Sequence, residues 1–131
     1  MSLPPQRRRT VEAPRNRVEL RAVRVVRDED GDADVSYLSQ EGFEDRLDEF
    51  KRGRLHFVEL WIEADVDIAE GVQAVVTSNG IGGIESDTTE EELDALIVEE
   101  WCSLRTALKT VGVPTDQLPL EVDPGWIEWR T

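Results

Sequence analysis

The sequence predicts a small α+β domain in which a mostly antiparallel three-stranded sheet packs against one long C-terminal helix and one short helix. Apolar residues alternate with acidic ones through residues 58–68, and they recur at helical spacing through residues 88–112. The chain has 131 residues, the length of one domain. We divide it into a disordered basic arm (1–16), a single α+β domain (17–113) and an extended tail that contains tryptophan (114–131).

The first strand is predicted within RVELRAVRVVR (17–27), which is rich in valine. Leu20 and Ala22 follow one phase of the alternation, and Val23 and Val25 follow the other. Such a change of phase predicts a β-bulge, or a strand that is buried on both faces near its end.

A short helix is predicted over EGFEDRLDEFKRG (41–53). Phe43, Leu47 and Phe50 are spaced four and three residues apart, which places them on one helical face. Gly53 is expected to end this helix.

The clearest strand is VELWIEADVDI (58–68), whose even-numbered residues are all apolar. Its opposite face carries the residues that we select as an interaction surface: Glu59, Trp61, Glu63, Asp65 and Asp67. The next segment, EGVQAVVTSNG (70–80), keeps Val72, Ala74 and Val76 in phase. The two segments therefore predict an antiparallel hairpin.

The long helix is predicted over TTEEELDALIVEEWCSLRTALKTVG (88–112). Thr88 and Glu91 have the spacing of a capping box, and Gly112 is expected to end the helix. Its predicted apolar stripe consists of Leu93, Ile97, Trp101, Leu104, Leu108 and Val111.

The tail carries Trp126 and Trp129. These two side chains either cap an open end of the core or form an exposed docking patch, because aromatic residues are common at protein interfaces. The DPG turn between LEV and WIEW favours a small terminal hairpin.

The net charge of −14 is spread unevenly along the chain. Residues 1–27 carry eight Arg and two Glu, whereas residues 28–131 carry 27 acidic and seven basic residues. A body this acidic repels nucleic acid and anionic membranes, so we expect a partner protein with a basic surface and no membrane contact. Only the basic arm favours contact with nucleic acid. The sequence leaves open whether the chain forms a homo-oligomer. It has a single cysteine and no secretory signal, which indicates the cytoplasm.

The loop DGDADVSYLSQE (30–41) places acids at ligand positions of a calcium-binding EF-hand loop, namely Asp30, Asp32, Asp34 and Glu41. Val35 stands where such a loop needs glycine, and a strand is expected before it instead of a helix. The alternative is a solvated turn, because Asp side chains hydrogen-bond to nearby backbone.

Other chemistry finds less support in the sequence. SNGIGGIESD (78–87) is rich in glycine, but it lacks the lysine of a P-loop, and its acids would repel phosphate. We therefore interpret it as a turn between a strand and a helix. His56 and Cys102 are the only residues of their kind, too few to complete a zinc site. We predict no cofactor and no catalytic residue.

Two runs resemble a family of small, acidic, uncharacterised bacterial proteins. They are SYLSQEGFEDRLDEFKRGRLHFVEL (36–60) and TSNGIGGIESDTTEEELDALIVEEW (77–101), whose counterparts read SYLxQEGFEDR and GIESD. Relatives tend to have an aromatic residue before GIESD, where this chain has glycine. The resemblance implies no activity, cofactor or site residue.

These observations favour a non-enzymatic cytoplasmic interaction or accessory module. The acidic strand face and the outer face of the long helix are the surfaces that we expect to be used. One alternative is a DNA-mimic inhibitor of an enzyme that handles nucleic acid, in which carboxylates imitate phosphates. Another is a protein whose carboxylates bind a divalent metal.

Overall fold

The computed structural model describes residues 18–130, so the predicted basic arm lies outside the described residues. The main elements follow one another as β1 (Glu19–Glu29), α1 (Glu44–Lys51), β2 (Phe57–Ala69), β3 (Val72–Thr77), β4 (Ile81–Glu85), α2 (Glu90–Thr110) and β5 (Ile127–Trp129). Short 3-10 helices lie at Ser36–Ser39, Thr115–Gln117 and Pro124–Trp126. Within the described part, no helix is both long and apolar enough to cross a membrane.

The predicted α+β class is confirmed, but the sheet has five strands instead of three. The strand order is β3-β2-β1-β5, and β4 also pairs with β2. Because β1 already occupies one edge of β2 opposite Val58 and Leu60, β4 takes the other edge, in line with β3. Strand β5 runs parallel to β1, so the sheet is mixed.

The alternating pattern predicts the two central pairings well. Strands β2 and β3 form the expected antiparallel hairpin, with Val66 opposite Ala74. Strand β1 pairs antiparallel with β2, and its register shifts between Leu20 and Ala22. That shift is the bulge that the change of phase predicts.

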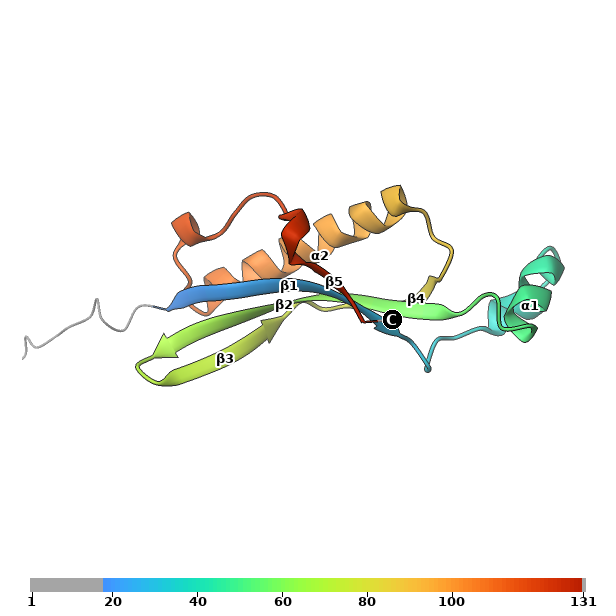
Figure 1. Ribbon diagram of the computed structural model, residues 1–131, viewed down its shortest axis with the longest axis horizontal. Helices are drawn as coiled ribbons and strands as arrows, with labels where there is room; N and C mark the ends of the chain where they lie inside the picture. Colours follow the sequence, from blue (N-terminus) through green and yellow to red (C-terminus); the bar gives the residue numbers. More distant parts are fainter. Residues whose placement is uncertain (1–17, 131) are drawn as a thin grey trace, which may run out of the picture.

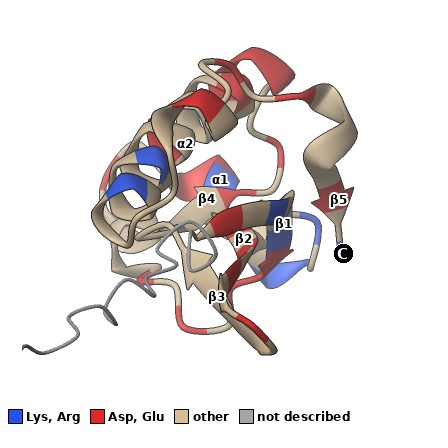
Figure 2. Cartoon of the chain, turned by 90° about the vertical axis from the view of Figure 1, so that its left-hand side faces the viewer, with Lys and Arg blue, Asp and Glu red and all other residues tan. Residues whose placement is uncertain are grey.

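The main core lies between α2 and one face of the sheet (Figure 1). The even-numbered residues of β2 from Val58 to Val66 are buried there against the apolar stripe of α2. Figure 2 shows α2 on one side of the sheet only. Among residues 18–130, no helix covers the opposite face along the length of α2.

Both ends of α2 differ in detail from the prediction. Thr89, not Thr88, caps the helix by accepting a hydrogen bond from Glu92 N, and Thr88 Oγ1 instead donates to the carbonyl oxygen of Glu85. Val111 follows the helix and is 45% exposed, so it lies outside the buried stripe. Gly112 has φ +105°, a left-handed conformation that suits the residue after a helix.

A second, smaller cluster lies at the other end of the sheet. Its buried residues are Leu38, Leu55 and Phe57, and Phe50 of α1 packs against them. Figure 1 shows α1 beyond the end of β4, far from α2. This end cluster is therefore separate from the main core.

The tail does not form the predicted terminal hairpin. Asp123 caps the 3-10 turn Pro124–Trp126 through a hydrogen bond from Gly125 N to its side chain, and the chain then enters β5. Strand β5 pairs with Val25–Arg27 of β1, which is about 100 residues away in sequence. A local turn pattern cannot reveal such a distant partner.

Leu104 and Val111 both belong to the predicted stripe of α2, but only Leu104 is buried, and this difference tests the core. Leu104 is fully buried, so Leu104→Ala should lower the free energy of unfolding by about 2–5 kcal/mol. Val111→Ala should change it by less than about 0.5 kcal/mol, because that side chain is exposed. Urea unfolding of both variants measures the difference. Similar losses for the two variants would contradict this assignment of the core.

Candidate functional site

The five residues selected on the acidic strand lie together on the face of the sheet opposite α2. This outer sheet face displays half-buried side chains from β2, namely Glu59, Trp61, Glu63, Asp65 and Asp67. The placement follows from strict alternation, since successive side chains of a strand point to opposite faces. The five residues therefore share one face, as predicted, but most of their carboxylates form ion pairs.

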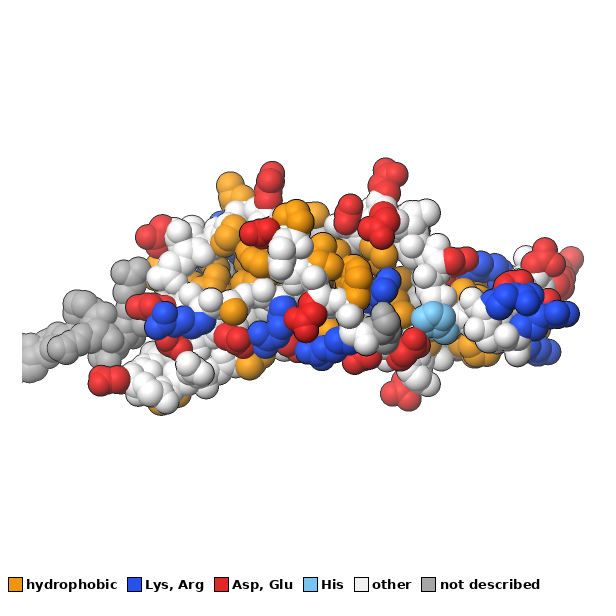
Figure 3. Space-filling model, in the orientation of Figure 1, with side chains coloured by type: hydrophobic (Ala, Val, Ile, Leu, Met, Phe, Trp, Pro, Cys, Tyr) orange, Lys and Arg blue, Asp and Glu red, His pale blue; other side chains and the backbone are white. Residues whose placement is uncertain are grey.

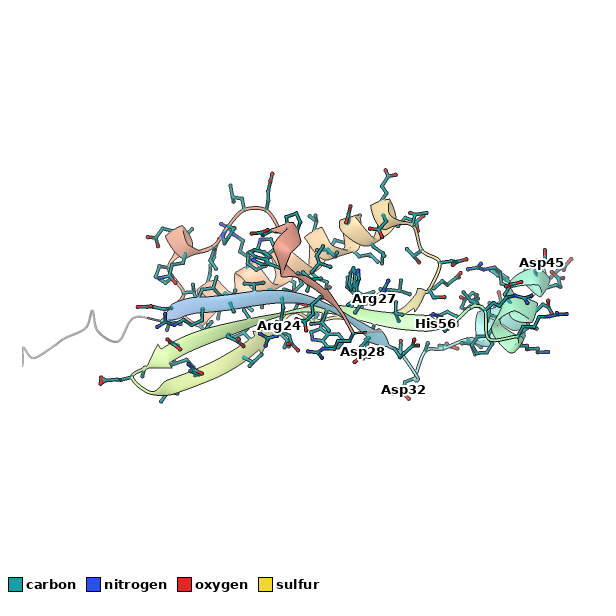
Figure 4. All side chains as sticks on the ribbon, viewed as in Figure 1. Arg24, Arg27, Asp28, Asp32, Asp45 and His56 are labelled. Carbon is teal, nitrogen blue, oxygen red and sulfur yellow. The ribbon has the colours of Figure 1, made fainter. Side chains whose placement is uncertain are left out.

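Arginines of β1 pair with three of the four acids on the outer sheet face, namely Glu63, Asp65 and Asp67. Arg24 lies opposite Glu63 in the ladder, and its Nε donates to Glu63 Oε1 at 2.6 Å. Its Nη atoms donate to the two Asp65 oxygens at 2.9 and 3.0 Å. Figure 4 labels Arg24 on the sheet. These hydrogen bonds from Arg24 hold the pKa of Asp65 below its usual range. Arg21 pairs in the same way with Asp67.

Glu63 is the best-connected carboxylate of this face. Trp61 Nε1 donates to Glu63 Oε2 at 2.8 Å, and the guanidinium of Arg130 lies 3.8 Å from Oε1. Burial raises the pKa of Glu63, but the hydrogen bonds from Trp61 and Arg24 outweigh it, so the net shift is downward. Glu63, Asp65 and Asp67 thus belong to a network of ion pairs, whereas Glu59 has no ion pair with a described residue.

The two tail tryptophans lie half-buried against the main core. Trp126 packs on Trp101 of α2 with ring centroids 5.0 Å apart. Trp129 is covered by the guanidinium of Arg27, whose Cζ lies 4.5 Å from the ring centroid. This cation–π contact and the core packing favour the capping alternative over an exposed docking patch.

The acidic loop uses its side chains to close local turns. Asp30 accepts hydrogen bonds from the backbone N–H of Asp32 at 3.1 Å and of Gly83 at 2.7 Å. Asp34 accepts from Ser36 N at 3.0 Å, and this bond lowers the pKa of Asp34. Between residues 18 and 130, no group of three or more His, Cys, Asp or Glu side chains is placed to hold a metal ion. The four residues predicted to bind calcium are thus not gathered around one point in the described structure: Asp30, Asp32, Asp34 and Glu41.

The glycine-rich segment is a strand and not the predicted turn. Its residues Ile81–Glu85 form β4, and Ile84 is buried in the main core. A Cβ on Gly82 would lie 2.8 Å from Asp30 Oδ2, so close approach of that carboxylate requires glycine. His56 hydrogen-bonds to Glu29 near the start of β2, whereas Cys102 is exposed on α2.

Glu100 is a buried acid that sequence reasoning missed. It is 6% exposed, and its Oε1 accepts hydrogen bonds from Ser78 Oγ at 2.6 Å and from Gly80 N at 2.7 Å. Ser78 Oγ in turn accepts from Ile62 N at 2.9 Å. These bonds fix the turn between β3 and β4 to α2. The signal was present, because Glu100 lies in phase with the apolar stripe of α2.

An apolar groove of about 470 Å³ runs between α2 and the segment before β5. We call it the α2 groove; its apolar lining consists of Ile97, Val98, Trp101, Leu120, Val122 and Ile127, and its acidic rim of Asp94 and Glu121. Figure 3 shows hydrophobic side chains gathered over the middle of the molecule, where this segment crosses in front of α2. Two of the lining residues are largely exposed, Leu120 at 79% and Val98 at 56%.

The first half of α2 carries acids that lack the ion pairs found on the sheet, and Asp94 is the one of them that lines the α2 groove. All five are exposed: Glu90, Glu91, Glu92, Asp94 and Glu99. None of them forms an ion pair with a described basic side chain, whereas Arg24 holds two acids on the outer sheet face. Figure 2 shows acidic residues on the early turns of α2 and basic ones near its far end. The first half of α2 is therefore a region of the described chain where negative charge is not balanced by ion pairs.

No protein-family model, curated protein or solved structure matches the chain. The resemblance to small acidic bacterial proteins stays a prediction. The α2 groove and the surfaces around it are therefore the features that bear on function.

The ion pairs of Arg24 predict a stability loss that depends on pH. Arg24→Met should lower the free energy of unfolding by about 1–3 kcal/mol at pH 7, because Glu63 and Asp65 lose their cation. The pKa of both acids is lowered in the folded state. This stabilisation is present above their unfolded pKa values, about 4, and is lost as pH falls through the folded values.

Urea unfolding of the variant and the native protein at pH 7 and at about pH 3 measures this dependence. The two proteins should differ less in acid. Arg52→Met is the control, because its pair with Asp48 is exposed on both sides and should contribute below about 0.5 kcal/mol. An equal loss at both pH values for Arg24→Met would mean that Arg24 acts through packing.

Proposed function

We propose that this protein is a non-enzymatic interaction module that binds a basic and apolar segment of a partner protein in the α2 groove. One observation carries the proposal: the groove is apolar and is bordered by acids that have no ion pair within the described chain. On the outer sheet face, which the sequence also favours, Arg21 and Arg24 hold Glu63, Asp65 and Asp67. The α2 groove is thus the better of the two surfaces for a cationic partner.

The apolar part of the groove supplies the affinity in this proposal. Leu120 and Val98 stand in water on the two sides of the groove, so a partner side chain between them would remove both from solvent. Trp101 and Ile97 form a rigid floor, because both are buried in the main core. A preformed floor lowers the entropy lost on binding.

The negative charge around the groove determines which partner segments it selects. Asp94 and Glu121 border the groove itself, and the exposed glutamates of the first turn of α2 extend the negative surface. A basic segment would meet these carboxylates with opposite charge, and an acidic segment would be repelled. Such attraction speeds association and weakens with salt.

The same uncompensated acids support a second candidate, a DNA-mimic inhibitor of an enzyme that handles nucleic acid. A mimic would rely on the carboxylates along α2 and would not need Leu120 or Val98. The two candidates therefore differ in whether the apolar residues of the groove matter.

Selection of short peptides from a random displayed library tests this proposal with a defined probe. Selected peptides should combine Arg or Lys with apolar residues, and they should bind at least about tenfold more weakly to Val98→Ser/Leu120→Ser. Val75→Ser is the matched control, since Val75 is 56% exposed like Val98 but lies on β3. Fluorescence anisotropy measures the affinities.

Salt separates the outcomes of this experiment. A groove-bound peptide should keep part of its affinity at about 0.5 M NaCl, because apolar burial is not screened. Peptides that are basic but not apolar, bind equally to the groove variant and are released by this salt would support the mimic. If no selected peptide distinguishes the groove variant from Val75→Ser, the groove proposal is wrong.

A further inference from the structure

Strand β3 lies at the margin of the sheet with part of its backbone unpaired. Ser78 N donates to the carbonyl oxygen of Ile62 at 2.9 Å, and the register continues with Ala64 opposite Val76 and Val66 opposite Ala74. Bonded and non-bonded pairs alternate in an antiparallel ladder, so these residues of β3 bond to β2. The N–H and C=O groups of the intervening residues point away from the sheet: Gln73, Val75 and Thr77. We call these outward groups the β3 edge.

The β3 edge lacks the usual protection against pairing with another strand. Natural edge strands carry charges or proline, bulge away, or lie under a loop. The segment Gly71–Ile84 contains no charged residue and no proline, although 34% of the whole chain is charged. Of the described residues, none donates to or accepts from the outward backbone groups of β3.

The opposite margin of the sheet is protected. There β5 covers Val25–Arg27 of β1, and the rest of β1 carries Glu19 and Arg21 at its bulged end. Figure 2 shows β3 at the lower margin of the sheet, with α2 above the sheet. The β3 edge is thus the uncharged margin of a highly charged molecule.

We infer that a second copy of this chain pairs with the β3 edge. The two β3 strands would run antiparallel about a two-fold axis at Val75, which would place Val75 opposite its equivalent and Gln73 opposite Thr77 of the other copy. All outward-facing residues are used in this register, giving about six hydrogen bonds between the copies. The sheet continues through both copies.

A second copy is the occupant that fits the β3 edge, because the edge is self-complementary and carries no charge that would repel its equivalent. Each chain carries a net charge of −14, so two copies repel each other wherever acids face acids. The β3 edge is free of charge over its whole length, and the symmetric register brings only uncharged residues of β3 together. Val72 and Val75, which are 50% and 56% exposed, would be covered by the partner strand.

Sedimentation velocity of the full chain from about 1 to about 500 µM tests this inference, because an edge pairing is a small interface and should be weak. The native protein should pass from monomer to dimer within this range. Val75→Lys would place two like charges at the axis and should remain monomeric. Val111→Lys should dimerise like the native protein, since Val111 is 45% exposed and lies neither on β3 nor in the lining of the α2 groove.

Two further measurements keep the test decisive. Raising NaCl from about 0.05 to about 0.5 M should strengthen dimerisation, because salt screens the repulsion between acidic bodies. Amide hydrogen exchange at Gln73, Val75 and Thr77 should slow as protein concentration rises, a readout that needs no variant. A native protein that stays monomeric at about 500 µM, or a dimer that Val75→Lys leaves intact while circular dichroism shows it folded, would overturn the inference.

Discussion

The strict alternation of β2 is the constraint on which the rest of the structure depends. Its even-numbered residues give α2 an apolar surface to cover, and its odd-numbered residues face the arginines of β1. Both of its backbone edges are also used, by β1 on one side and by β3 and β4 on the other. A shift of β2 by one residue would move every buried aliphatic side chain into water and every carboxylate under the helix.

The same strand explains why the charge of this protein is unevenly compensated. Arginines can pair with acids of the outer sheet face because the β1 register brings Arg24 beside Glu63. Within the described residues, no basic side chain of a neighbouring strand forms an ion pair with the acids in the first turns of α2. Those acids are instead stabilised by the positive end of the helix dipole and by water. The sheet surface is thus largely neutral because β1 places arginines beside β2, and the surface of α2 stays negative because no such arginines of the described chain lie beside its first turns.

Local patterns in the sequence predict the elements whose burial they describe directly. Alternation predicts β2, β3 and the bulge of β1, and helical spacing predicts α2. Pairing between distant segments leaves no such pattern: β5 joins β1 across about 100 residues, and Arg24 meets Glu63 only after β1 and β2 have aligned. The glycines of β4 suggested a turn, because glycine favours both turns and close backbone approach. The α2 groove also escaped prediction, since the segment before β5 has no regular periodicity.

The end cluster around Leu38, Leu55 and Phe57 shares no residue with the main core. Strand β2 spans both clusters, and Arg46 of α1 adds ion pairs to Glu85 and Asp87 beside α2. Contacts of Tyr37 and Arg46 with Glu85 of β4 also join the two regions. The end cluster has three buried residues and the main core has 14, so local opening of residues 33–55 should need less free energy than opening of the middle of the molecule.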